Sequence, residues 1–289
     1  YSFTIESLLY ESLKQNWGEE RYHKVLANIN SIMLATIAIS GILGGFLYSI
    51  NPRYPFYLCG IFNIFGMVIS FFIKEPNITN KVKLSLNLYT DTLINGTKQL
   101  FGNKNFRFLV VLFITIGSLV VISEEVLDYS LSVQFGFDEK ALGILFAIVY
   151  LFATVSSQIG NTIVNKIGNY KSIILLSLIM IFSFLISPLI SGVTGGIIIL
   201  IRNSLFPVFN IISYTEINKN IESKYRTTVL SAFSMFKQVP YVISAFFIGY
   251  LTDIFTAVNV AFLLGIIFLI LIIPQLILLV KRKTATIQR

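Results

Sequence analysis

The sequence predicts an all-α fold, that of a polytopic helical membrane protein, from its composition, its long apolar segments and the placement of its basic residues. Of the 289 residues, 55% are apolar and 12% are charged, and the mean hydropathy is +0.79. Soluble domains carry about 25% charged residues. Because a water-soluble fold could not cover so much apolar surface, we expect many of these residues to face lipid.

The apolar segments have the length of helices that cross a bilayer, which need roughly 20 apolar residues. The strands of a membrane barrel would instead alternate over about ten residues. Residues 1–13 have the pattern of the end of one further helix, and the polar connection 74–106 repeats leucine. That repeat predicts a cytosolic helix along the membrane surface, with a flexible linker as the alternative. The eight full segments lie at residues 26–49, 54–73, 107–127, 141–164, 172–191, 195–214, 229–252 and 257–280.

The basic residues alternate between the two sides of the predicted membrane. Eighteen Lys and Arg residues occupy every second connection and the C-terminal tail, whereas the other connections hold only Arg53 and Lys140. By the positive-inside rule, the basic connections and the C-terminus face the cytosol. The net charge of +8 therefore reflects topology. We expect the lipid bilayer, and no nucleic acid, as the partner.

The chain also repeats itself weakly. Residues 8–51 align with residues 212–255 at a spacing of 204 residues, with nine identities, and both copies lead from a charged loop into a long apolar helix. Parallel repeats of this size are typical of transporters built from two similar halves. This predicts the end of an N-terminal six-helix half (1–73), a cytosolic interdomain loop (74–106) and a complete C-terminal six-helix half (107–289). By the same spacing, about 100 further residues are expected upstream.

Four stretches carry a resemblance to a known family: LLYESLKQNWGEERYHKVL (8–26), IVNKIGNYK (163–171), INKNIESKYRTTVLSAFSMF (217–236) and GYLTD (249–253). They are similar to loops and helix ends of the major facilitator superfamily, in particular of its bacterial drug-efflux-like members. The resemblance implies a major-facilitator-like fold that lacks its first helices. The chain would then hold the last two to three helices of the N-terminal half and helices 7 to 12.

The loop at 163–171 resembles the motif that takes part in conformational change in this family. Lys166 and Gly168 stand at the family's basic and glycine positions, and Lys171 is displaced by one residue. Asn165 stands where the family has an acid. The resemblance thus implies Lys166, Gly168 and Lys171 as conformational-loop residues.

Lys237 is the first candidate for a residue that acts in transport. It lies ten residues after Thr227, near the start of its apolar segment, which at about 1.5 Å per residue places it near the bilayer midplane. An ionisable side chain at that depth is costly and is often functional. Beside Gln238, and one turn before a predicted kink at Pro240, Lys237 is expected either to bind an anionic group or exchange charge, or to form a structural ion pair with the N-terminal half.

Arg202 and three acidic residues form a second candidate group. Arg202, Glu124 and Glu125 lie in apolar segments that correspond to the tenth and seventh helices, which line the central cavity in the resembling family. We expect Arg202 to meet Glu124 or Glu125, and a carboxylate there could carry protons. Asp128 shares a helix face with Glu124, and we expect it to be a solvated helix end.

Two neutral amides complete the candidate residues. Gln158 and Asn210 lie within apolar segments and could bind substrate. Interhelical hydrogen bonds between such amides are the alternative. A single cysteine, Cys59, and a single histidine, His23, provide no metal site and no disulfide framework.

Together these features predict a secondary transporter that works by alternating access, with proton-coupled efflux of small organic compounds as the first expectation. Metabolite uptake by the same fold is an open alternative, as are a non-transporting receptor and a membrane-embedded enzyme. Direct ATP drive is not expected, because the sequence has no phosphate-binding G-x-x-x-x-G-K-[ST] loop. Enzymatic activity is not expected either, because one His, one Cys and the lack of an H-E-x-x-H motif provide neither metal ligands nor a nucleophile with its base. We expect a plasma-membrane protein, bacterial and monomeric, without cofactor or metal; the sequence leaves substrate and direction open.

Overall fold

The computed structural model describes residues 22–72, 86–102, 104–221 and 226–287, and within these ranges the regular structure is helical. The predicted helix end at 1–13 and the first part of the connection 74–106 lie outside the described residues. The helices are α2 (Tyr22–Ile50), α3 (Tyr54–Ser70), α4 (Leu86–Gly102), α5 (Lys104–Ile122), α6 (Asp128–Gln134), α7 (Glu139–Ile167), α8 (Asn169–Leu185), α9 (Gly192–Asn220), α10 (Arg226–Phe255) and α11 (Ala257–Ile287).

Each predicted apolar segment lies mainly on a helix. Among the described residues, five helical stretches are long and apolar enough to cross a membrane: Phe106–Gln134, Glu139–Gly160, Gly192–Asn220, Thr228–Phe255 and Ala257–Lys281. The other three predicted segments are shorter apolar helices, at Ala35–Ile50, Tyr54–Ser70 and Asn169–Leu185. The predicted class, an all-α helical membrane fold, is confirmed.

The chain divides into two compact units. The first contains α2, α3 and the first nine residues of α7, Glu139–Ala147, and the second contains Ser85–Asp138 and Ile148–Arg289. Within the first unit, α3 has no buried residue. Gly45 of α2 lies so close to the start of α7 that a Cβ there would be 2.6 Å from the carbonyl oxygen of Glu139.

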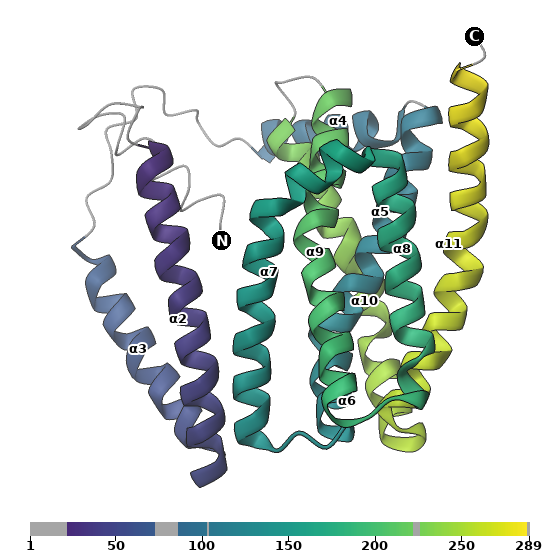
Figure 1. The fold of residues 1–289 in the computed structure, drawn as a ribbon. Helices are drawn as coiled ribbons and strands as arrows, with labels where there is room; N and C mark the ends of the chain where they lie inside the picture. Colours follow the sequence, from purple (N-terminus) through teal and green to yellow (C-terminus); the bar gives the residue numbers. More distant parts are fainter. Residues whose placement is uncertain (1–21, 73–85, 103, 222–225, 288–289) are drawn as a thin grey trace. The chain divides into compact units, whose positions relative to one another are not determined.

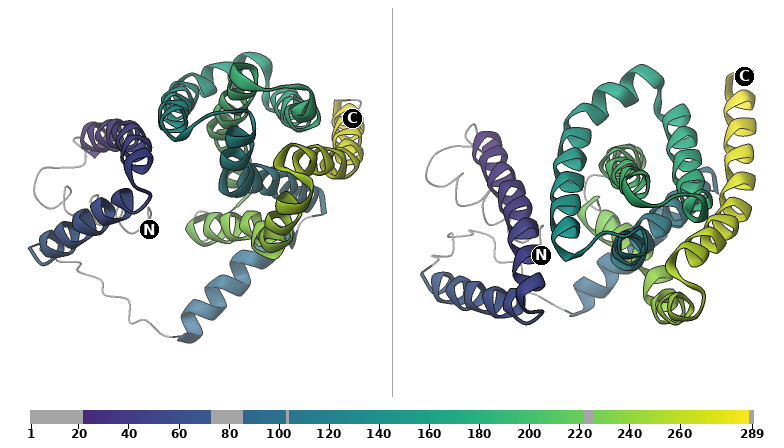
Figure 2. Two further views of the ribbon diagram at one scale, coloured as in Figure 1. Left: turned by 90° about the horizontal axis from the view of Figure 1, so that it is seen from below. Right: turned by 60° about the horizontal axis from the view of Figure 1, so that its bottom comes forward.

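The second unit is a helical bundle with its core between α5, α8, α9, α10 and α11. α11 packs against α8, and α10 packs against α5 (Figures 1 and 2). Phe113 of α5, Phe184 of α8 and Phe233 of α10 are fully buried. α5 thus lies among the other helices, so polar groups that it carries are held inside the bundle.

α4 belongs to the same unit and lies at the end of the bundle where α11 finishes (Figure 1). It packs against α10 and α5. Its residue Leu100 is fully buried, and the ring of Phe101 meets Phe236 of α10 edge to face, with centroids 5.4 Å apart. The connection 74–106 therefore contains a helix, as its leucine pattern indicated, while its contact with the membrane surface stays a prediction.

Candidate functional site

A single π-helical turn, Ser123–Leu127, interrupts the long helix formed by α5 and α6. In this turn the amide of Asp128 donates to the carbonyl oxygen of Ser123, five residues earlier, instead of four. The extra residue brings the side chains of Ser123 and Asp128 together, and the Ser123 hydroxyl donates to Asp128 Oδ1 at 2.8 Å. Turns of this kind occur frequently at functional sites.

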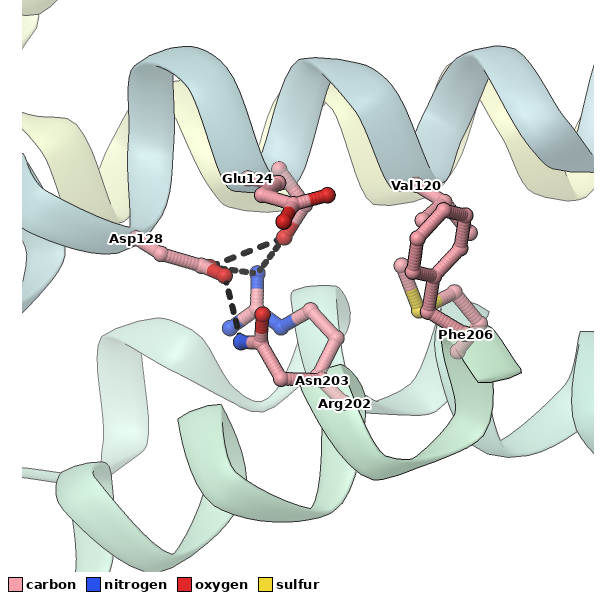
Figure 3. Close-up of a pocket in the computed structure, with 8 residues that line it drawn as sticks. Val120, Glu124, Asp128, Arg202, Asn203 and Phe206 are labelled. Carbon is pink, nitrogen blue, oxygen red and sulfur yellow. Dashed lines mark hydrogen bonds and ion pairs between the residues drawn. The ribbon is translucent and has the colours of Figure 1, made fainter. Parts of the chain in front are cut away.

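Asp128 forms an ion pair with Arg202 of α9 inside the bundle (Figure 3). Arg202 Nη1 lies 3.3 Å from Asp128 Oδ1, and the two side chains are 1% and 2% exposed. Arg202 Nη1 also donates to the Ser123 hydroxyl at 3.2 Å, and Asn203 Nδ2 donates to Asp128 Oδ2 at 2.7 Å. Both carboxylate oxygens of Asp128 therefore accept hydrogen bonds, as a buried charge requires.

The guanidinium group of Arg202 is only partly satisfied. Its plane lies over the ring of Phe184, with Cζ 4.2 Å from the ring centroid. Its Nε and Nη2 atoms are buried and have no hydrogen-bond partner among the described residues. Arg202, Asp128, Glu124 and Phe206 line a small, partly open pocket with room for about one water molecule (Figure 3). Two buried donor atoms beside a pocket can donate hydrogen bonds to an oxygen of water or of a ligand.

The ion pair corrects two expectations. The acid that pairs with Arg202 is Asp128 and not Glu124 or Glu125, both of which are exposed. Asp128, expected as a solvated helix end, is 1% exposed. The physical reason is the π-helical turn. The prediction assumed a regular α-helix, whereas the extra residue in the turn directs the Asp128 side chain into the bundle.

Lys237 lies inside the same unit and is 5% exposed. Its Nζ donates to Asn210 Oδ1 at 3.3 Å and to the Tyr214 hydroxyl at 3.4 Å, both on α9. Four aromatic rings surround it, with centroids between 5.0 and 6.0 Å from Nζ. They belong to Phe206, Phe209, Tyr214 and Phe233.

A glycine of α5 makes room for the Lys237 side chain. A Cβ atom on Gly117 would lie 2.5 Å from Lys237 Cδ and 2.8 Å from Cγ, distances that nonbonded carbons do not reach. The neighbouring Ser118 hydroxyl donates to the backbone carbonyl of Lys237 at 3.0 Å. Gly117 and Ser118 thus fix the position of α10 next to α5.

Three neutral amides remain from the predicted site residues. Asn210 contacts Lys237, whereas Gln158 and Gln238 are exposed. Sequence reasoning missed Asn203 and Tyr214, which lie on α9 one residue after Arg202 and one turn after Asn210. Both are polar residues in an apolar helix, and each stands next to, or one turn away from, a residue that was already a candidate. That position is the signal that could have identified them.

The loop between α7 and α8 consists of Gly168, which has a φ of 89°. Glycine adopts this left-handed conformation without steric cost. Lys166 and Lys171 on either side are exposed. In this region Asn169 donates a hydrogen bond to Glu216 Oε1 of α9, and Lys219 Nζ lies 3.2 Å from the same oxygen.

Comparison with known proteins gives the family. The family model "Major Facilitator Superfamily" matches residues 10–244. The chain belongs to the Major Facilitator Superfamily. It is also 27% identical, over 275 residues, to the uncharacterized MFS-type transporter YxaM of Bacillus subtilis (strain 168), in an alignment that covers 90% of this chain and 67% of the relative.

Membership of the Major Facilitator Superfamily identifies a multi-pass membrane protein that moves a small molecule across a lipid bilayer. The resemblance to this family that was predicted from the loops and helix ends is therefore confirmed. Among the described residues no group of three His, Cys, Asp or Glu side chains could hold a metal ion.

Proposed function

We propose that the chain is a secondary active transporter that exports small organic compounds in exchange for protons by alternating access. It would act as a monomer in the plasma membrane of a bacterium, with a cytosolic C-terminus and without enzymatic activity. The observation that supports this most is the ion pair of Asp128 and Arg202, buried between α5 and α9 and next to a pocket lined by Glu124. A charged network inside a membrane bundle is costly and rarely without function.

Glu124 is the group that we assign to the proton. Its carboxylate reaches the pocket and is exposed, so that it can exchange protons with water. Asp128 is already engaged by Arg202, Ser123 and Asn203. A proton on Glu124 changes the charge of the pocket by one unit. In this proposal, that change biases the opening of the cavity to one side or the other.

Transport can be tested in liposomes that contain the full-length protein. A pH gradient is imposed, and the movement of a panel of dyes and metabolites is followed. We expect gradient-driven flux of at least one compound, directed as export with respect to the cytosolic C-terminus. Folded protein that moves no compound under any gradient contradicts the proposal, and flux in the opposite direction contradicts efflux.

The proton site has its own control. Glu124→Gln keeps the size of the side chain and removes its titration, so coupling to the gradient is expected to fall by at least tenfold. Asp253→Asn removes an exposed carboxylate near the end of α10 and is expected to leave coupling unchanged. Equal coupling in the two variants would remove Glu124 from the proposal.

A further inference from the structure

Lys237 carries a buried positive charge that the described residues do not balance. Between described residues the ion pairs are Arg202 with Asp128 and Lys219 with Glu216, and neither includes Lys237. An unpaired ammonium group inside a protein costs several kcal/mol. What the site lacks is a negative charge.

The hydrogen bonds of the ammonium group are weak. A lysine ammonium has three N–H donors, and two of these reach the neutral oxygens of Asn210 and Tyr214 at 3.3 and 3.4 Å. Hydrogen bonds from an ammonium group to a carboxylate are shorter, about 2.7–2.9 Å. An anionic oxygen could therefore take the free donor, or replace one of these acceptors, with a net gain.

The aromatic rings hold the charge without neutralising it. A ring face attracts a cation through its quadrupole, but it contributes no net charge. Phe209 and Phe233 are buried, and Phe206 and Tyr214 are partly exposed. The two partly exposed rings provide flat apolar surface next to the ammonium group.

α9 connects this site to the pocket at Arg202. Arg202, Phe206, Asn210 and Tyr214 are spaced by four residues, so each lies about one turn after the one before it and together they form a stripe along α9. Phe206 contributes both to the pocket and to the rings around Lys237. Along this stripe the flat apolar ring of Phe206 is next to both cationic groups, and the Nε and Nη2 atoms of Arg202 have no hydrogen-bond partner among the described residues.

We propose that Lys237 binds an anionic group of the transported compound, so that the substrates are organic anions with a flat, apolar body. This inference rests on the proposed transport function. The anionic group takes the place of the missing counter-charge at Nζ, and the apolar body lies against Phe206 and Tyr214. Asn210 positions the ammonium group.

The test compares two dyes that share a xanthene ring system and differ in charge, carboxyfluorescein as the anion and rhodamine 123 as the cation. Equilibrium binding to the purified full-length protein in detergent is measured by fluorescence polarisation. We expect the parent protein to bind carboxyfluorescein more tightly than rhodamine 123. Lys237→Met is expected to weaken carboxyfluorescein binding at least tenfold, and Lys237→Arg to retain most of it.

Lys219→Met is the matched control, because it removes an exposed lysine at the end of α9. It is expected to leave binding unchanged. If Lys237→Met does not fold, Asn210→Asp tests the same point with almost no change of shape. It places a carboxylate beside Nζ as an internal anion, and carboxyfluorescein binding should again fall at least tenfold.

Three results overturn the inference: a parent protein that does not bind carboxyfluorescein, one that binds rhodamine 123 at least as tightly, or unchanged affinity in folded Lys237→Met. Liposome flux separates this inference from the proposed function. Export of rhodamine 123 alone would preserve transport and reject the anion site. Binding of carboxyfluorescein that depends on Lys237, without flux of any compound, would preserve the anion site and reject transport.

Discussion

Ser123 donates a 2.8 Å hydrogen bond to Asp128 across a π-helical turn, and this contact orients the acid toward Arg202. The Ser123 hydroxyl also accepts a hydrogen bond from Arg202 Nη1 at 3.2 Å. One hydroxyl group therefore contacts both members of the buried ion pair. The geometry of the pair depends on a local irregularity of the helix and not on the two charges alone.

Asp128→Asn is expected to destabilise the protein by about 3–5 kcal/mol, because it leaves the charge of Arg202 buried without a counter-charge. The melting temperature of the protein in detergent measures this loss. Glu125→Gln removes an exposed acid three residues earlier and should change stability by less than about 0.5 kcal/mol.

In the double variant Asp128→Asn with Arg202→Met, the loss of stability should be smaller than in Asp128→Asn alone. An equal or larger loss would mean that the pair is not coupled.

The positions of the helices were predictable because the length of an apolar segment can be read from the local sequence. The ends of the helices were less predictable. The predicted segment 172–191 continues past Leu185, where α8 ends and a short 3-10 turn, Ser187–Leu189, follows. Apolar residues continue through this turn, so hydropathy does not mark the end of the helix, although Pro188 is a signal for it.

The candidate site was predictable as a set of residues but not as a set of contacts. The cost of burying Lys237 and Arg202 follows from their positions within apolar segments of the sequence. The choice of Asp128 as the partner of Arg202 depends on the π-helical turn, which a periodicity of 3.6 residues does not foresee. The rings around Lys237 come from α9 and α10, and their convergence depends on helix packing.

Gly117→Ala tests the close approach between α5 and Lys237. The added Cβ would lie 2.5 Å from Lys237 Cδ, so the lysine must move or the helices must separate. We expect a loss of about 1–3 kcal/mol in stability, together with weaker carboxyfluorescein binding. Gly249→Ala in α10, where nothing lies within 4 Å of the new Cβ, should instead stabilise by about 0.4–1 kcal/mol. Similar melting temperatures for the two variants would show that this approach is not close in solution.

Glu216→Ala removes an acceptor that Asn169 and Lys219 share. The hydrogen bond from Asn169 joins the start of α8 to the end of α9, and its loss is expected to cost about 1 kcal/mol. Lys219→Ala removes only the ion pair with a largely exposed lysine and should cost less than about 0.5 kcal/mol. Limited proteolysis of the connection between α7 and α8 is expected to be faster in Glu216→Ala only. Equal rates in both variants would assign the effect to the surface charge.

Thr256, between α10 and α11, has a φ of 72°, whereas three other positions with positive φ, Gly136, Gly168 and Gly192, are glycines. A β-branched residue in this left-handed region is strained by about 1–2 kcal/mol. Thr256→Gly relieves the strain, although glycine also increases the entropy of the unfolded chain. A net stabilisation of about 0.5–1 kcal/mol is therefore expected, seen as a higher melting temperature. Thr252→Gly, inside α10, gains no such relief and should destabilise. A lower melting temperature for Thr256→Gly would show that the threonine side chain stabilises this turn by more than its conformation costs.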